Sequence, residues 1–187
     1  KMFKHLQSMI NKNINTRSYL EIGPGHGLFS FYSINKLKKL THFTAVDISK
    51  TSLNLTINFI KSLISKNKLI DYEFIEGDFL KIKQNKKKYD LIVCGEVLEH
   101  VENPVKLLDN INVFLNKNGK VFISTCINCP AIDHVNQFNK VEDITKLFKK
   151  SKFKIISQKI LPVEKMNYTN AIKKKITINY SAILKKN

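Results

Sequence analysis

The sequence predicts an α/β fold, in which a parallel sheet carries helices on both faces. Segments typical of strands and segments typical of helices alternate from residue 19 onward, as parallel strands joined by crossover helices require. Two strand segments, 90–94 and 121–124, are mostly apolar and partly β-branched, like strands that are buried on both faces. Acidic residues or glycines follow several strands, where open α/β sheets bind their ligands.

The individual elements are bounded by polar or turn-forming residues. The predicted strands cover residues 19–22, 42–47, 71–76, 89–94, 120–125, 154–159 and 176–183. The predicted helices cover residues 3–14, 27–40, 49–67, 104–115 and 141–151. Ser49 is a suitable N-cap, and Asn103-Pro104 places a capping side chain before a proline in the first helical turn. Asn118-Gly119 predicts a turn, and the lysine-rich segment 77–88 predicts a loop or a single turn.

Length and cysteine content indicate one domain in a reducing compartment. A chain of 187 residues can bury a full core. No apolar run approaches the ~20 residues that span a bilayer, and residues 1–14 do not resemble a secretory signal, so we expect a cytoplasmic protein. Cys94, Cys126 and Cys129 suit this location. Cys126 and Cys129 form a lone Cys-x-x-Cys after a predicted strand, so we expect neither structural zinc nor a thioredoxin-like redox site.

The chain is strongly basic, with a net charge of +17 and an isoelectric point near 9.8. Such a charge would suit a polyanionic partner. Almost all of it is lysine, however, and Arg17 is the only arginine. Arginine is the favoured side chain for bidentate contacts with phosphates and bases, so a nucleic-acid partner is the less favoured expectation. The lysine clusters at 86–88, 149–150 and 173–175 are expected to be solvated surface, with an anion-attracting face as the alternative.

The segment Tyr-Leu-Glu-Ile-Gly-Pro-Gly-His-Gly at 19–27 is the strongest indication of a ligand. It reads as a short strand followed by a turn, with Glu21 before Gly23, Gly25 and Gly27. Glycine lacks a Cβ, so such a turn lets a ligand approach the backbone, and the next helix would point its N-terminus there. The spacing is neither the Gly-x-Gly-x-x-Gly of dinucleotide binders nor a phosphate loop.

Neighbouring strand ends carry side chains that suit one elongated ligand. Asp47 can accept two hydrogen bonds from a ribose diol, and Ile48 can lie on an adenine face. Asp78 can accept from an exocyclic amine, with the backbone of Phe79 facing the ring. Glu96 follows the fourth strand. Because the carboxyl ends of parallel strands meet at one edge of the sheet, we expect these residues to share a site.

These motifs together resemble those of class I S-adenosylmethionine-dependent methyltransferases of the small, seven-stranded kind. The matching segments are 19–27, 44–47, 76–79, 90–104 and 116–121. The segment 90–104 contains Glu-Val-Leu-Glu-His and is similar to the branch that includes ubiquinone-biosynthesis O-methyltransferases. The resemblance covers about residues 15–160.

The resemblance implies a Rossmann-like three-layer sandwich with a seven-stranded, mostly parallel sheet and an antiparallel last strand. Residues 1–187 would form one methyltransferase domain, with an N-terminal helix in 1–15 and an active-site loop in 126–140. The implied cofactor is S-adenosylmethionine, and its product is S-adenosylhomocysteine. The residues expected to hold it are Glu21, Gly23, Gly25, Gly27, Asp47, Ile48, Asp78, Phe79 and Glu96.

A hydroxyl acceptor would need a general base on the rim that faces the transferred methyl group. His134, which Asp133 can orient, and His100 are the candidates; their alternative roles are an exposed loop histidine and a capping or packing residue. Glu96, Glu99 and His100, joined by His134, also resemble the divalent-metal site of some ubiquinone-pathway O-methyltransferases and small-RNA 2′-O-methyltransferases. The same Glu-Val-Leu-Glu-His occurs in metal-free relatives, so we assign no metal.

The expected function is O-methylation of a small molecule or of a cell-surface precursor that carries a sugar or phosphate. The lysines favour an anionic acceptor, and no RNA-binding module is evident. One alternative is a metal-assisted RNA 2′-O-methyltransferase, and a second is a non-catalytic, methyltransferase-like binding subunit. The choice between oxygen and nitrogen as the attacked atom stays open, as does the oligomeric state.

Overall fold

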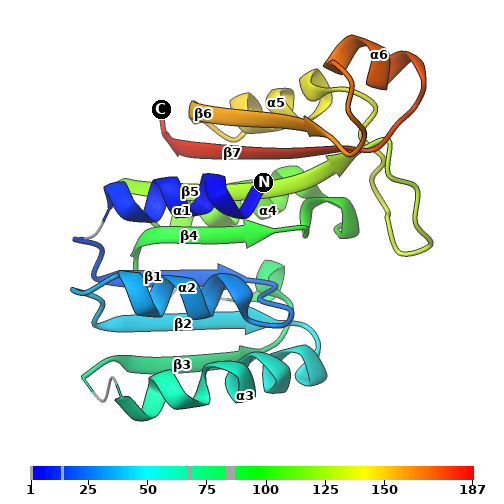
Figure 1. The fold of residues 1–187 in the computed structure, drawn as a ribbon. Coiled ribbons are helices and arrows are strands. Elements are labelled where there is room, and N and C mark those ends of the chain that lie inside the picture. Colours follow the sequence, from blue (N-terminus) through cyan, green and yellow to red (C-terminus); the bar gives the residue numbers. More distant parts are fainter. Residues whose placement is uncertain (1, 14, 67–68, 83–86) are drawn as a thin grey trace.

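A computed structural model describes residues 2–13, 15–66, 69–82 and 87–187, which form a layered α/β structure (Figure 1). The strands are β1 (Ser18–Ile22), β2 (His42–Asp47), β3 (Asp71–Glu76), β4 (Tyr89–Gly95), β5 (Leu115–Ile127), β6 (Phe153–Pro162) and β7 (Ile178–Lys186). The α-helices are α1 (Met2–Lys12), α2 (Leu28–Lys36), α3 (Lys50–Lys66), α4 (Pro104–Phe114), α5 (Val141–Lys150) and α6 (Tyr168–Lys173). Two short 3₁₀ turns, η1 (Phe79–Lys81) and η2 (Leu98–His100), follow β3 and β4.

The strands form one sheet in the order β3-β2-β1-β4-β5-β7-β6. The first five strands pair in parallel, whereas β7 runs antiparallel to both β5 and β6. The predicted fold class, including the antiparallel last strand, is therefore confirmed. The chain moves outward from β1 to β3 and then returns to the other side of β1, which places the switch point of the sheet between β1 and β4.

Helices cover both faces of the sheet, with α1, α2 and α3 on one face and α4 and α5 on the other (Figure 1). Side chains alternate between these two cores along each strand, as the pleat requires. In β4, for example, Leu91 and Val93 pack with α1, α2 and α3, whereas Ile92 and Cys94 pack with α4 and α5. Both faces of the central strands are thus buried, which explains their nearly continuous apolar sequences.

Most element boundaries agree with the sequence prediction, but β5 is much longer than expected. Its first residues include the predicted turn at Asn118-Gly119, and the pairing with β4 shifts register between Tyr89 and Leu91. The extra residues of β5 form an irregularity within the strand, and the strand continues beyond them. The six-residue helix α6 was not predicted. The single turn expected within 77–88 is η1.

Parts of three predicted segments lie outside the described residues: position 14 of the first helix, position 67 of the third helix and positions 83–86 of the loop. Among the described helices, none has both the length and the apolar character that crossing a bilayer requires.

Candidate active site

A cavity of about 460 Å³ lies at the carboxyl ends of β1, β2, β3 and β4. Its size is in the range of small-molecule sites. The predicted residues that line it are Gly23, Gly25, Asp47, Ile48, Asp78, Phe79, Glu96 and His100. The predicted residues that do not line it are Glu21, Gly27, Glu99 and His134. The sequence prediction that four strand ends share one site therefore agrees with the geometry.

The three glycines of the first turn have different structural roles. Gly23, Gly25 and Gly27 all adopt positive φ angles, of 65°, 56° and 80°. A Cβ on Gly25 would meet no atom within 4 Å, so this backbone stays open to the cavity. A Cβ on Gly27 would instead lie 3.1 Å from the backbone of Thr56. Gly25 is thus the position that a ligand can approach, whereas Gly27 lets α3 pack against the turn.

Asp47 ends β2, and only one of its carboxylate oxygens has a hydrogen-bond partner among the described residues. Its Oδ1 accepts a hydrogen bond of 2.8 Å from the backbone N–H of Ser49, which fixes the side chain. Within the described residues, the second oxygen has no hydrogen-bond partner. The backbone N–H of Gly77 donates to the carbonyl of Asp47 at 2.8 Å, which brings the end of β3 to the same cavity. Ile48 beside it is largely exposed at the mouth.

Asp78 and Phe79 form the next part of the wall. Asp78 Oδ1 accepts from the backbone N–H of Leu80 at 2.9 Å and so caps η1. Its Oδ2 lies 3.7 Å from the exposed ammonium group of Lys81. The Phe79 ring is buried against Phe114, with ring centroids 5.3 Å apart. A short capped turn therefore holds a carboxylate and a backbone segment at the cavity edge.

The segment after β4 supplies two carboxylates with different environments. Glu96 adopts a positive φ of 54° and lines the cavity. Loss of hydration and the neighbouring Glu99 raise the pKa of the Glu96 carboxyl. Glu99 is buried in η2, and its Oε2 accepts a hydrogen bond of 2.7 Å from Thr125 Oγ1. The ligand oxygens of the two carboxylates lie within 4.8 Å of each other, but only Glu96 lines the cavity.

Of the two histidines predicted as bases, only His100 lines the cavity. Its Nδ1 donates to the carbonyl oxygen of Asp133 at 3.0 Å and lies 3.4 Å from the Asp133 carboxylate. His134 instead donates from Nδ1 to the carbonyl of Cys129 at 2.6 Å. The sequence suggested that Asp133 orients its neighbour His134, but the carboxylate pairs with His100. Both oxygens that contact Nδ1 are acceptors, so the basic nitrogen of neutral His100 is Nε2.

A family model described as a methyltransferase domain matches residues 15–181, which is most of the chain. The chain belongs to the class I S-adenosylmethionine-dependent methyltransferase family. A ubiquinone biosynthesis O-methyltransferase from Paraburkholderia phytofirmans is 30% identical over 110 residues, which are 58% of this chain and 44% of that protein. A tRNA U34 carboxymethyltransferase from Campylobacter curvus is 29% identical over 114 residues, 60% of this chain and 36% of that protein.

This methyltransferase chain therefore spans less than half the length of these two curated relatives. A crystal structure of an S-adenosylmethionine-dependent methyltransferase from Clostridium acetobutylicum aligns with a TM-score of 0.72 at 14% identity, covering 99% of this chain and 91% of that one. At 14% identity, this similarity shows that the two proteins share a fold and nothing more.

The cavity of the methyltransferase fits the cofactor of its family. The open backbone at Gly25 and the unpaired oxygen of Asp47 are the features that a nucleoside with an amino-acid tail needs. Asp47, Asp78, Glu96 and Asp133 give the lining an acidic character, and no lysine is among the described lining residues. A sulfonium cation is stabilised by such a lining.

Three lysines of the methyltransferase line a different hollow. A second hollow of about 350 Å³, near the amino ends of β2 and β3, is lined by Lys38, Lys39 and Lys66 among other residues. These three lysines do not line the main cavity, whereas the Lys81 ammonium lies 3.7 Å from Asp78 in its wall. Sequence reasoning also missed the apolar wall of Leu80, Val97, Val101 and Leu107, because these residues come from short turns and from α4.

Glu21 supports the glycine turn from within the core. It is only 1% exposed, and its Oε2 accepts hydrogen bonds from Tyr19 Oη at 2.7 Å and Ser30 Oγ at 2.5 Å. Burial raises the pKa of the Glu21 carboxyl from 4.5 to about 7, and the two hydroxyl donors partly offset that rise. Glu21 was predicted to bind the cofactor; the structure places it in the core, outside the cavity lining, where it links β1 to α2.

The stability of the methyltransferase should fall as the pH rises from about 5 to 8, partly because of Glu21. Below pH 4.5 the carboxyl is protonated in both folded and unfolded states, whereas between 4.5 and about 7 only the folded state keeps the proton. The free energy of unfolding then decreases with pH, by about 3 kcal/mol in total. Glu21→Gln should remove this decrease in urea melts at pH 5 and pH 8. Glu76→Gln, at an exposed strand end, is the control. If the free energy of unfolding changed equally with pH in both variants, the pH dependence could not be assigned to Glu21.

The predicted metal set is only partly brought together. Glu99, His100 and His134 have ligand atoms within 4.8 Å of one another. Glu96 instead groups with Glu99 and Cys126. Glu99 is the one residue that these two groups share.

Proposed function

We propose that this chain transfers a methyl group from S-adenosylmethionine to a hydroxyl group of a small molecule, acting as one domain over residues 1–187. The observation that carries the proposal is the single cavity in which the glycine turn, Asp47, Asp78 and Glu96 meet. When bound, S-adenosylmethionine supplies an electrophilic methyl group on a sulfonium cation. The chain itself then has to bind, orient and deprotonate its acceptor.

The residues have distinct roles in this proposal. The backbone at Gly23 and Gly25 contacts the amino-acid tail, and the free oxygen of Asp47 accepts from the ribose hydroxyls. Asp78 and Ile48 hold the adenine ring. Glu96 contributes negative charge close to the sulfonium. These assignments need only the side chains that line the cavity.

His100 is the general base in this proposal. It lies on the cavity wall, and its contact with Asp133 holds the ring with Nε2 as the basic nitrogen. A neutral hydroxyl is a poor nucleophile until a base removes its proton, so His100 suits an O-methyltransferase. The acidic lining favours a neutral acceptor over the anionic one that the lysine content suggested. In this proposal the segment 126–140, which begins in the last two residues of β5, lies beside the acceptor.

A second candidate is metal-assisted 2′-O-methylation of RNA. The convergence of Glu99, His100 and His134 favours it, because a carboxylate and two imidazoles can hold a divalent cation. The tRNA carboxymethyltransferase among the relatives is also an RNA-directed protein by name. The lysines, however, do not line the cavity. A non-catalytic binding subunit is the third candidate function.

Calorimetric titration with S-adenosylmethionine and S-adenosylhomocysteine tests the proposal, with NAD⁺ as a control for nonspecific nucleotide binding. We expect one bound cofactor per chain and no binding of NAD⁺. Transfer of a labelled methyl group should then be measured with phenols, sugars and sugar phosphates in one series and with short RNAs in another. Methyl transfer to RNA alone would favour the RNA 2′-O-methyltransferase. Cofactor binding without any methyl transfer would favour the non-catalytic binding subunit. The absence of cofactor binding would overturn the proposal.

A further inference from the structure

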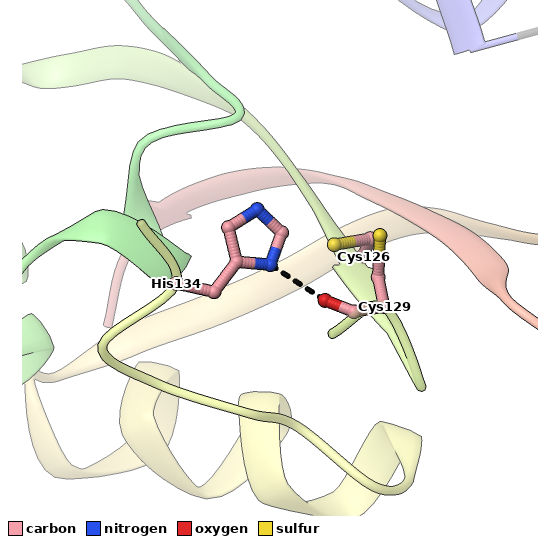
Figure 2. Close-up of side chains that lie close together, drawn as sticks. All are labelled: Cys126, Cys129 and His134. Atoms are coloured by element: carbon pink, nitrogen blue, oxygen red, sulfur yellow. Dashed lines mark hydrogen bonds between the residues drawn. The ribbon is translucent and has the colours of Figure 1, made fainter. Parts of the chain in front are cut away.

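We propose that Cys126, Cys129 and His134 form a zinc site beside the cavity. The two sulfur atoms and a ring nitrogen of His134 all lie within 4.8 Å of one another. Figure 2 shows the sulfurs side by side next to the imidazole. Tetrahedral zinc, with Zn–S and Zn–N bonds of about 2.3 and 2.0 Å, holds such donors roughly 3.3–3.8 Å apart. A small contraction of the loop therefore brings all three donors to one ion.

The backbone explains why the two thiols lie on the same side. Cys126 is held in β5, where it pairs with Asn179 of β7. Asn128 adopts a left-handed conformation with φ of 51°, which turns the chain between the cysteines. Its N–H donates to the carbonyl of Phe138 at 2.9 Å and closes the base of the loop. Cys129 follows directly, so the turn places both side chains together.

His134 keeps one ring nitrogen available for a metal ion. Because Nδ1–H donates to the carbonyl of Cys129 at 2.6 Å, Nε2 carries the free lone pair. Metal-binding histidines commonly have this second hydrogen bond, which fixes the tautomer and the ring. The loop is further anchored through Asn136, whose N–H donates to the carbonyl of Glu99 at 2.9 Å and whose side chain donates to the carbonyl of Val101.

The donor chemistry selects zinc over magnesium or manganese. Two thiols and an imidazole are soft or borderline ligands, whereas magnesium and manganese prefer oxygen. Glu99 lies next to this set, with its Oε1 4.0 Å from Cys126 Sγ, but it does not group with all three donors. Burial and the neighbouring Cys129 and Glu99 raise the pKa of the Cys126 thiol, so a bound cation would have to displace the proton of this thiol.

The zinc site differs from the metal set predicted from sequence, although both use His134. The cysteines were set aside because the Cys-x-x-Cys has no second pair. His134 was considered as a base, as an exposed loop residue, or as a metal ligand together with Glu96, Glu99 and His100. The expected role is structural. His134 directly follows Asp133, which contacts His100, so an ion at the thiols would hold the loop that supports the base.

Cobalt(II) substitution tests the proposal with a spectrum that does not depend on activity. The chain should be purified with a reductant, stripped with a chelator and titrated with cobalt chloride. We expect one ion per chain, a sulfur-to-cobalt charge-transfer band and the intense visible bands of a tetrahedral site, all abolished by one equivalent of zinc. Cys126→Ser and Cys129→Ser should each weaken zinc binding more than about 100-fold, beyond the usual loss for an outer-shell partner.

Matched variants separate the site from nonspecific effects. Cys94→Ala removes the remaining cysteine, which is buried in β4, and should leave the cobalt spectrum unchanged. His42→Ala is the exposed control for His134→Ala, and only the latter should lose the tetrahedral bands. Zinc-edge X-ray absorption of the unsubstituted chain should report two sulfur neighbours, which covers the case in which a serine variant does not fold.

Four results would overturn the proposal. The first is the absence of a charge-transfer band, and the second is an equal cobalt spectrum for the unsubstituted chain and for Cys126→Ser. The third is displacement of cobalt by equimolar manganese, and the fourth is oxidation to a Cys126–Cys129 disulfide even with zinc present. S-adenosylhomocysteine binding should be measured on the same samples. Its failure with an intact cobalt spectrum would count against the proposed function and not against the zinc site.

Discussion

Replacing His100 with alanine should lower kcat for methyl transfer to a hydroxyl acceptor by about 10²–10⁴-fold, the usual contribution of a general base. His100 is the only one of the two predicted bases that lines the cavity, and Asp133 holds its Nδ1. The affinity for S-adenosylhomocysteine should change little, because the proposed ribose and adenine contacts lie at the ends of β2 and β3 and directly after them. Steady-state kinetics, with calorimetry of the same variant, separates the two effects.

His100→Gln distinguishes a base from a positioning residue. Glutamine keeps an N–H donor for the Asp133 carbonyl but has no basic nitrogen. If His100 removes a proton, the glutamine variant should be as slow as the alanine variant. A glutamine variant with more than half of the original kcat would show that His100 only positions its neighbours. His26→Ala, an exposed histidine at the glycine turn, should keep normal turnover.

Replacing Asp47 with alanine should weaken S-adenosylhomocysteine binding by about 1–3 kcal/mol, or roughly 5- to 150-fold, through loss of charged hydrogen bonds. The side chain is already held by Ser49, so its free oxygen is available without a large ordering cost. Asp47→Asn should also bind weakly even though its carbonyl can keep the Ser49 contact, because an amide donor replaces the second acceptor. Calorimetric titration measures both variants directly.

Glu76 offers a matched control for Asp47. It ends the neighbouring strand β3 and is the register partner of Asp47, but it does not line the cavity. Glu76→Ala should therefore leave cofactor affinity within about twofold, as surface substitutions usually have effects below 0.5 kcal/mol. Equal losses for Asp47→Ala and Glu76→Ala would indicate a general charge effect and would remove Asp47 as the ribose partner.

The sheet was predictable because its strands follow local rules. β2 and β3 were predicted at their observed bounds, since each is a compact β-prone run between turn residues. β5 was predicted too short because Asn118-Gly119 is a strong turn signal, and pairing with β4 overrode it. α6 was missed because a six-residue helix has too few turns for periodicity to be evident.

The sequence by itself determined which strand-end residues meet at the cavity. Gly23, Gly25, Asp47 and Asp78 follow successive parallel strands, and parallel topology alone brings such positions to one edge. Only the tertiary structure decided that Asp133 contacts His100, that Glu21 is enclosed by Tyr19 and Ser30, and that His134 lies beside the thiols. These contacts depend on how a long loop and several side chains pack across the fold, and no residue spacing encodes that packing.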